Sequence, residues 1–110
     1  DMATSVLFNR TNINGIPCIE SRSMTETTTS VTFNFDASPS VSPRFSGLIA
    51  VRIANTPTSL TLPVSFNVPS IVGSTIALTA SDGTPATGAD VPEAIYLVFY
   101  DRANGVLQIV

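Results

Sequence analysis

The sequence contains no lysine, no histidine and no tryptophan, and only 12% of its 110 residues are charged. Without histidine the chain can form neither a Ser-His-Asp triad, nor a Cys-His pair, nor a histidine metal site. Five arginines and eight acidic residues give a net charge of −3. Nucleic-acid binding needs clustered positive charge. These arginines are scattered along the chain, so we expect no nucleic-acid partner.

Cysteine is almost missing as well, since Cys18 is the single one. A single cysteine excludes an internal disulfide and a cysteine-cluster metal site. We expect a small buried residue at this position, with an intermolecular disulfide or a reactive thiol as the alternatives. No apolar run is long enough to span a membrane, and no signal peptide is visible. If Met2 is the native start, the protein is made without export, and Asp1 is a tag remnant or a product of processing.

Apolar residues, in contrast, make up 44% of the chain, which is enough for one domain, residues 1–110, with a modest core. The stretch 94–110 reads AIYLVFYDRANGVLQIV. Its first seven residues form a short β-branched and aromatic run, which predicts a strand buried on both faces. Asn104-Gly105 predicts a hairpin turn before a second strand at 106–110. We expect this hairpin to have its first arm in the middle of a sheet.

Alternation of apolar and polar residues predicts further strands at 5–10, 16–19, 28–36, 47–55, 59–68 and 71–79. No segment has a sustained helical period. Seven to eight short strands indicate an all-β fold, an antiparallel β-sandwich or barrel of jelly-roll or Ig-like type. Pro17 places its strand at a sheet edge or bulge, Pro63 indicates an edge strand, and Gly73 marks a bulge. The predicted core consists of Val31, Phe33, Phe35, Ile49, Val51, Ile53, Leu62, Val64, Phe66, Leu97 and Phe99.

The acidic residues are the remaining source of chemistry, but no two of them lie in a short motif. At strand ends and in loops, Asp side chains typically stabilise turns, and we expect this role for Asp36, Asp82, Asp90 and Asp101. The alternative is a calcium site, because loop 82–90 carries two carboxylates and free carbonyls, although without EF-hand spacing. We predict neither enzymatic activity nor a cofactor.

Four residues are candidates for an interface. Arg52 lies on an otherwise apolar strand, where it either pairs with an acid or reaches a partner. Tyr96 and Tyr100, with Phe99 between them, are either core residues or a sugar-stacking patch. Ile109 lies on the last predicted strand, whose apolar edge needs a covering neighbour. We therefore select Arg52, Tyr96, Tyr100 and Ile109 as candidate interface residues.

Three stretches carry a resemblance to a known group: VLFNR at 6–10, the threonine-rich 25–32, and IYLVFYDR at 95–102. They resemble small β proteins of tailed-phage virion modules, those of crAss-like phages of gut Bacteroidetes among them. The resemblance covers most of the chain and implies a structural virion protein: a head decoration, auxiliary capsid or head-fibre component. It implies assembly in the host cytoplasm, a place in the virion, and the major capsid protein or another virion protein as partner. It assigns no functional residue.

The low charge also bears on self-association. An apolar, threonine-rich domain with so few charges is expected to associate unless its surfaces are covered, so we expect a homo-oligomer. The competing hypothesis is a carbohydrate-binding or adhesin-like module, which an exposed aromatic platform would favour.

Overall fold

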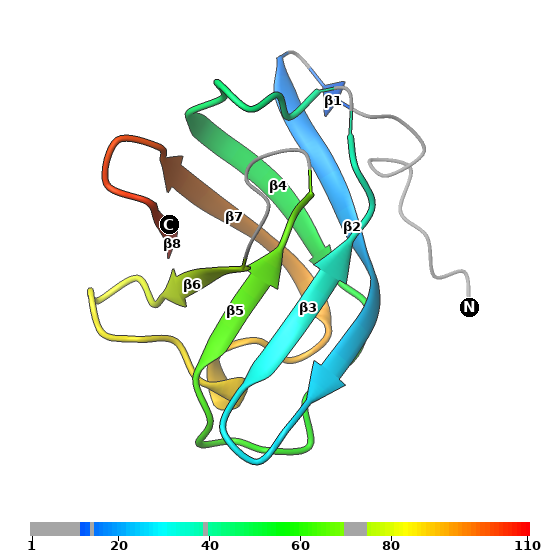
Figure 1. Ribbon diagram of the computed structural model, residues 1–110, viewed down its shortest axis with the longest axis vertical. Helices are drawn as coiled ribbons and strands as arrows, with labels where there is room; N and C mark the ends of the chain where they lie inside the picture. The colour runs from blue at the N-terminus through cyan, green and yellow to red at the C-terminus, as the bar shows by residue number, and fades with distance from the viewer. Residues whose placement is uncertain (1–11, 14, 39, 70–74) are drawn as a thin grey trace.

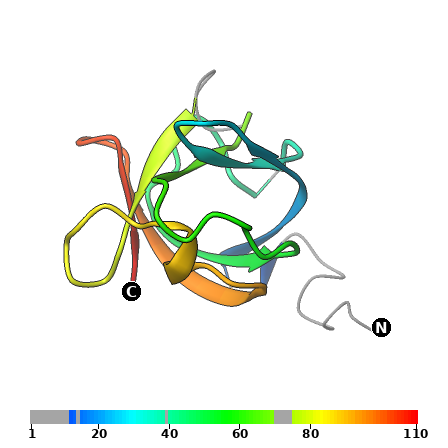
Figure 2. The ribbon, with the colours of Figure 1, turned by 90° about the horizontal axis from the view of Figure 1, so that it is seen from below.

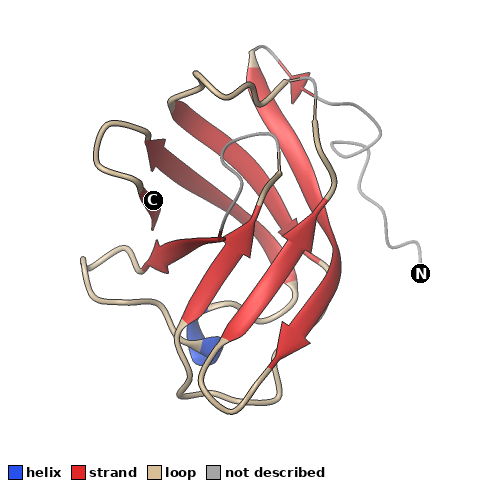
Figure 3. Ribbon diagram, viewed as in Figure 1, coloured by secondary structure: helices blue, strands red, loops and turns tan. Residues whose placement is uncertain are grey.

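The computed structural model describes residues 12–13, 15–38, 40–69 and 75–110. These residues form strands joined by turns and loops, with one short 3-10 helix and no α-helix in the described ranges (Figures 1 and 3). The all-β prediction is therefore confirmed. The elements are β1 (Asn12–Ile13), β2 (Ile16–Glu26), β3 (Val31–Phe35), β4 (Gly47–Ile53), β5 (Val64–Asn67), β6 (Thr75–Thr79), the 3-10 helix Gly88–Asp90, β7 (Ala94–Asp101) and β8 (Val106–Ile109).

Seven of the strands close into a barrel. Their order is β2-β3-β5-β6-β8-β7-β4, and β4 pairs again with β2, while β1 adds to the beginning of β2. Figure 2 shows the strands arranged around a central space when the barrel is viewed from below. Of the predicted alternatives, the barrel is the one observed.

The barrel is mixed, so the prediction of an antiparallel sheet is wrong. The pairs β2–β4, β3–β5 and β6–β8 are parallel, and the other pairs of the ring are antiparallel. Each parallel pair joins two strands that are separated by exactly one strand in the sequence. That intervening strand runs back in the opposite direction, which brings the third strand parallel to the first. A jelly-roll or Ig-like arrangement is not confirmed.

The core prediction is largely confirmed for the strands with clean alternation. Of the predicted core residues on β3, β4 and β5, all are buried inside the barrel, and Leu62 is partly buried against them. The prediction that Leu97 and Phe99 are core residues is wrong, because each is 45% exposed. A barrel wall has a single interior face, so a strand that is apolar on both sides must present one of them outward.

The hairpin turn predicted at Asn104-Gly105 is observed between β7 and β8, with Gly105 at φ +66°. Gly15, between β1 and β2, also has a positive φ, +85°. The edge assignments of β5 and β8 are wrong, since each lies between two ring neighbours. β2 also has two ring neighbours, but its pairings with them begin after Pro17, at Cys18 with β4 and at Ser21 with β3. Pro17 pairs with Asn12 of β1, and Pro63 lies just before β5. Closing the ring removes the edge that Pro63 was expected to mark. The predicted strand 5–10 and the bulge at Gly73 lie outside the described residues.

Candidate interaction surface

The outer side of β7 carries a row of exposed apolar side chains. Ile95, Leu97 and Phe99 are 46%, 45% and 45% exposed, whereas Val98 and Tyr100 between and beyond them are buried. This is the two-residue alternation of a strand with one face in the core. The strand therefore has an inside and an outside although its composition does not distinguish them.

Neighbouring strands widen this row into a surface. Leu48 of β4 lies opposite Phe99 in the ladder and is 39% exposed. Val110 follows β8, is 70% exposed, and donates its backbone N–H to the carbonyl oxygen of Leu97 at 3.0 Å. We refer to Leu48, Ile95, Leu97, Phe99 and Val110 together as the β7 face. Neighbouring strands lie about 4.8 Å apart and alternate residues about 7 Å apart, so the five side chains are contiguous.

A buried arginine borders one end of the β7 face. Arg52 lies opposite Ile95 and is only 8% exposed. Its guanidinium lies 3.1 Å from the carboxylate of Glu93 and 3.5 Å from that of Glu20, and it also donates to the backbone oxygen of Ile53 at 3.2 Å. Of the two roles considered for Arg52, pairing with acids is the observed one. Its charge is satisfied within the chain.

The other three candidate residues turn inward. Tyr100 is 2% exposed in the core, and Ile109 is partly buried against the core. Tyr96 also packs against the core and donates its hydroxyl to the carbonyl oxygen of Pro92 at 2.6 Å. Burial raises the pKa of the Tyr96 phenol, and the negative charge of Asp90 raises it further.

This orientation excludes the sugar-stacking patch, which was the alternative to a core role for Tyr96 and Tyr100. Of its three aromatic residues only Phe99 lies on the outside, so no platform of stacked rings forms. Ile95, Leu97 and Leu48 were not predicted to lie on the surface, yet all three are exposed. In a run that is apolar at every position, the alternation that separates inside from outside is hidden. Of the two roles considered for Tyr96 and Tyr100, the core role is the observed one.

A shallow hollow of about 300 Å³ lies beside the β7 face. Its lining residues are Ser81, Phe99, Gln108, Ile109 and Val110. The Gln108 side-chain amide donates to the backbone oxygen of Ser81 at 3.4 Å, which fixes a polar group at the border of the apolar surface. The β7 face is therefore contiguous with this hollow, which Phe99 and Val110 also line.

In loop 82–90, which was considered for calcium, the carboxylates accept hydrogen bonds from the loop itself. Asp82 accepts from the hydroxyl and the backbone N–H of Thr84 at 2.7 and 3.1 Å, and these bonds lower the pKa of its carboxyl group. Asp90 accepts from the backbone N–H of Thr87 at 2.9 Å. Within the described ranges no three His, Cys, Asp or Glu side chains group as metal ligands would. Asp side chains that stabilise turns, as predicted, account for this loop.

The remaining sequence predictions concern single residues. Asp36 pairs with Arg22 at 2.9 Å, and Asp101 accepts from the side-chain amide of Asn104 at 2.7 Å. Cys18 is buried, as expected, at 6% exposure.

The part of the chain that the structure describes has no helix with the length and apolar character needed to cross a membrane. Comparisons of the chain with protein-family models, curated proteins and solved structures give no match.

Proposed function

We propose that this chain is a non-enzymatic structural protein of a virion, a capsid auxiliary, decoration or head-fibre component, which self-associates through the β7 face. The virion assignment is supported by the sequence resemblance at 6–10, 25–32 and 95–102. Self-association is supported by the outward row of Ile95, Leu97 and Phe99, and this is the observation that carries the docking role.

The energetics favour covering this face. Burial of apolar surface contributes about 25 cal/mol per Å², and contiguous exposed apolar surface on a small domain typically marks an interaction site. With a net charge of −3, little electrostatic repulsion opposes contact between copies. Two polar groups border the face: Arg52 with its partner Glu93, and Gln108. A polar rim borders the apolar centre of protein interfaces in the same way.

A second copy of the chain is the occupant that fits best. The exposures of Ile95 and Phe99 are nearly equal on the two sides of Leu97. A two-fold axis at Leu97 that runs β7 antiparallel to its counterpart places Leu97 on Leu97 and Ile95 on Phe99, which is the isologous contact of a symmetric dimer. Since the seven-strand ring is closed, the sheets associate face to face, with interdigitating side chains.

Light scattering at micromolar concentration tests this proposal with two matched variants. Leu97→Asp places a charge at the centre of the face, and Leu60→Asp places one at a residue that is 59% exposed in the loop between β4 and β5. We expect the mass of a dimer or a larger closed oligomer for the unmodified chain and for Leu60→Asp, and a monomer mass for Leu97→Asp. Circular dichroism of each variant shows whether the fold is retained.

A monomer mass for the unmodified chain at every concentration, with Leu97→Asp changing nothing, rejects self-association. In that case, binding of the chain to assembled capsids, measured by co-sedimentation with and without Leu97→Asp, tests attachment to the major capsid protein through the same face.

A further inference from the structure

A second cavity, separate from the β7 face, opens where the barrel wall parts between β6 and the β7–β8 turn. The β6–β8 pairing consists of Leu78↔Leu107 and Thr79↔Gln108, so the beginning of β6 has no partner on β8. The opening has a volume of about 370 Å³, within the range of roughly 300–1,000 Å³ typical of small-molecule pockets. Its lining residues are Pro43, Thr75, Ile76, Ala77, Tyr100, Arg102 and Gly105.

The phenol of Tyr100 supplies this pocket with an unused donor. The residue is 98% shielded, its exposure being 2%, yet its hydroxyl makes no hydrogen bond to any residue in the described ranges. No buried side-chain polar atom in those ranges lacks a partner, so the hydroxyl must reach open space. The pocket is the open space that Tyr100 lines. A hydroxyl held there by a packed ring favours a ligand that accepts its hydrogen bond.

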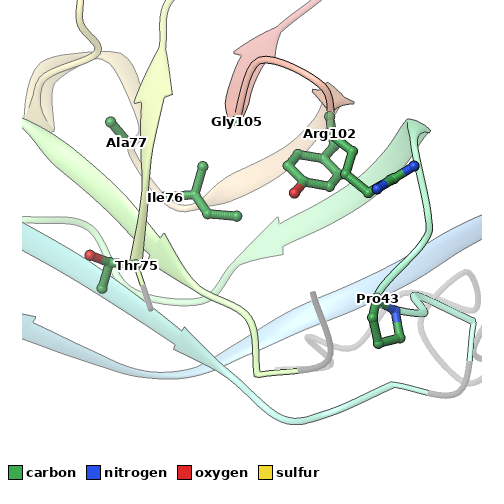
Figure 4. Close-up of a pocket in the computed structure, with 7 residues that line it drawn as sticks. Pro43, Thr75, Ile76, Ala77, Arg102 and Gly105 are labelled. Atoms are coloured by element: carbon green, nitrogen blue, oxygen red, sulfur yellow. The ribbon is translucent and has the colours of Figure 1, made fainter. Parts of the chain in front are cut away.

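Arg102 supplies the charge. It is exposed, and in the part of the chain that the structure describes its guanidinium has no ion pair. The adjacent carboxylate of Asp101 is engaged by the backbone N–H and the side-chain amide of Asn104, at 3.3 and 2.7 Å. Figure 4 shows Arg102 and Pro43 on one side of the pocket, with Ile76 and the neighbouring residues of β6 on the other.

We propose that this pocket binds an organic monocarboxylate. The guanidinium of Arg102 and the hydroxyl of Tyr100 donate to the carboxylate oxygens, and Ile76, Ala77 and Pro43 contact the hydrocarbon part of the ligand. The planar arginine fork matches a carboxylate in two parallel hydrogen bonds. One cation and one neutral donor balance a single negative charge, and the nearby Asp101 disfavours a dianion such as phosphate.

Nuclear magnetic resonance titration tests this site with three probes: hexanoate, the neutral analogue hexan-1-ol, and inorganic phosphate. We expect hexanoate to shift the methyl resonances of Ile76 in a saturable way. Hexan-1-ol lacks the charge and should bind at least about tenfold more weakly than hexanoate, because hydrogen bonds to charged groups are stronger than those between neutral groups. Phosphate should not compete with hexanoate at equal concentration.

Three variants locate the binding groups. Arg102→Gln should weaken hexanoate binding about tenfold or more, and Tyr100→Phe, which keeps the ring in the core, about threefold to tenfold. Arg44→Gln is the control, because this arginine is exposed on the loop before β4 and lies outside the pocket lining. This substitution should change the affinity for hexanoate less than twofold.

Each contrary result overturns the proposal. Ile76 methyl resonances that do not move with hexanoate exclude the site, and equal binding of hexan-1-ol excludes a role for the carboxylate. An effect of Arg44→Gln equal to that of Arg102→Gln shows general charge attraction, and tighter binding of phosphate shows the wrong ligand class. If Tyr100→Phe does not fold, the comparison of Arg102→Gln with Arg44→Gln still decides.

Discussion

Phe33 and Phe66 pack edge to face inside the barrel, with ring centroids 6.1 Å apart and ring planes at 90°. They are paired in register on the parallel strands β3 and β5. The ring of Phe35 lies 5.0 Å from that of Phe66 and completes the aromatic centre of the core. Such pairs contribute beyond the area that they bury, so we expect this cluster to contribute strongly to stability.

Substitution of Phe33 tests the core against a matched phenylalanine on the surface. Phe33 is fully buried and Phe99 is 45% exposed. We expect Phe33→Ala to lower the free energy of unfolding by about 3–5 kcal/mol, because it leaves a cavity, and Phe99→Ala to lower it by about 1 kcal/mol or less. Denaturant unfolding in the Leu97→Asp background, which we expect to be monomeric, measures both without a contribution from association. If Phe99→Ala lowers the free energy of unfolding as much as Phe33→Ala does, Phe99 is a core residue, and the inside and outside of β7 are exchanged.

The contrast between these two residues shows where sequence analysis succeeds. On β3 the polar residues Thr32 and Asn34 alternate with Phe33 and Phe35, and this alternation fixes the buried face. On β7 every residue from Ala94 to Tyr100 is apolar or aromatic, so hydrophobicity carries no information about register. Only the closure of the barrel, which involves strands far apart in the sequence, decides which side faces inward.

The second half of β2 was missed for the opposite reason. Residues 21–26 read SRSMTE and are almost entirely polar, yet they pair with β3 along its whole length. Met24 packs against the core opposite Phe33, and a register shift between Ser21 and Ser23 interrupts the alternation. A bulge of this kind moves the side chains to the other face, which hides the strand from an analysis of periodicity.

Substitution of Gly88 is expected to disrupt the loop before β7. The residue is buried, its backbone N–H donates to the carbonyl oxygen of Leu62 at 3.2 Å, and a Cβ there would overlap the backbone carbonyl of Ser59. We expect Gly88→Ala to lower the free energy of unfolding by about 1–3 kcal/mol, the usual cost of inserting a methyl group into packed surroundings. Thermal unfolding, followed by circular dichroism, measures the change.

The neighbouring Ala89 is the control for this loop, because it is exposed. Ala89→Ser should leave the melting temperature nearly unchanged, since surface substitutions usually stay within about 0.5 kcal/mol. If Gly88→Ala melts together with the unmodified chain, the 3-10 helix Gly88–Asp90 does not pack against Ser59 as described.

Glu26, at the end of β2, holds the loop between β4 and β5 through its carboxylate. It accepts from the hydroxyl of Thr58 at 2.9 and 3.0 Å, from the backbone N–H of Thr58 at 3.2 Å, and from that of Ser59 at 3.2 Å. The hydroxyl of Thr58 is the largest cause of a lowered pKa for the Glu26 carboxyl group, and the two backbone N–H groups add to it. All three donors stabilise the charged form.

The sign of the resulting pH dependence follows from the lowered pKa. The contribution of Glu26 to stability is fully present above the pKa of glutamate in the unfolded chain, and it is lost as the pH falls through the lower pKa of the folded state. In a titration from about pH 6 to below pH 4, near and beneath the ordinary glutamate pKa, we expect the amide resonances of Thr58 and Ser59 to move toward exchange-broadened or coil-like positions. In Glu26→Gln, which has no titrating carboxyl group, this transition should disappear.

Asp82 is a matched control, because its carboxylate holds Thr84 in the same way and also has a lowered pKa. Asp82→Asn should abolish the transition at Thr84 and leave that at Thr58 intact. A transition at Thr58 that persists in Glu26→Gln would assign the acid sensitivity of this loop to a different group.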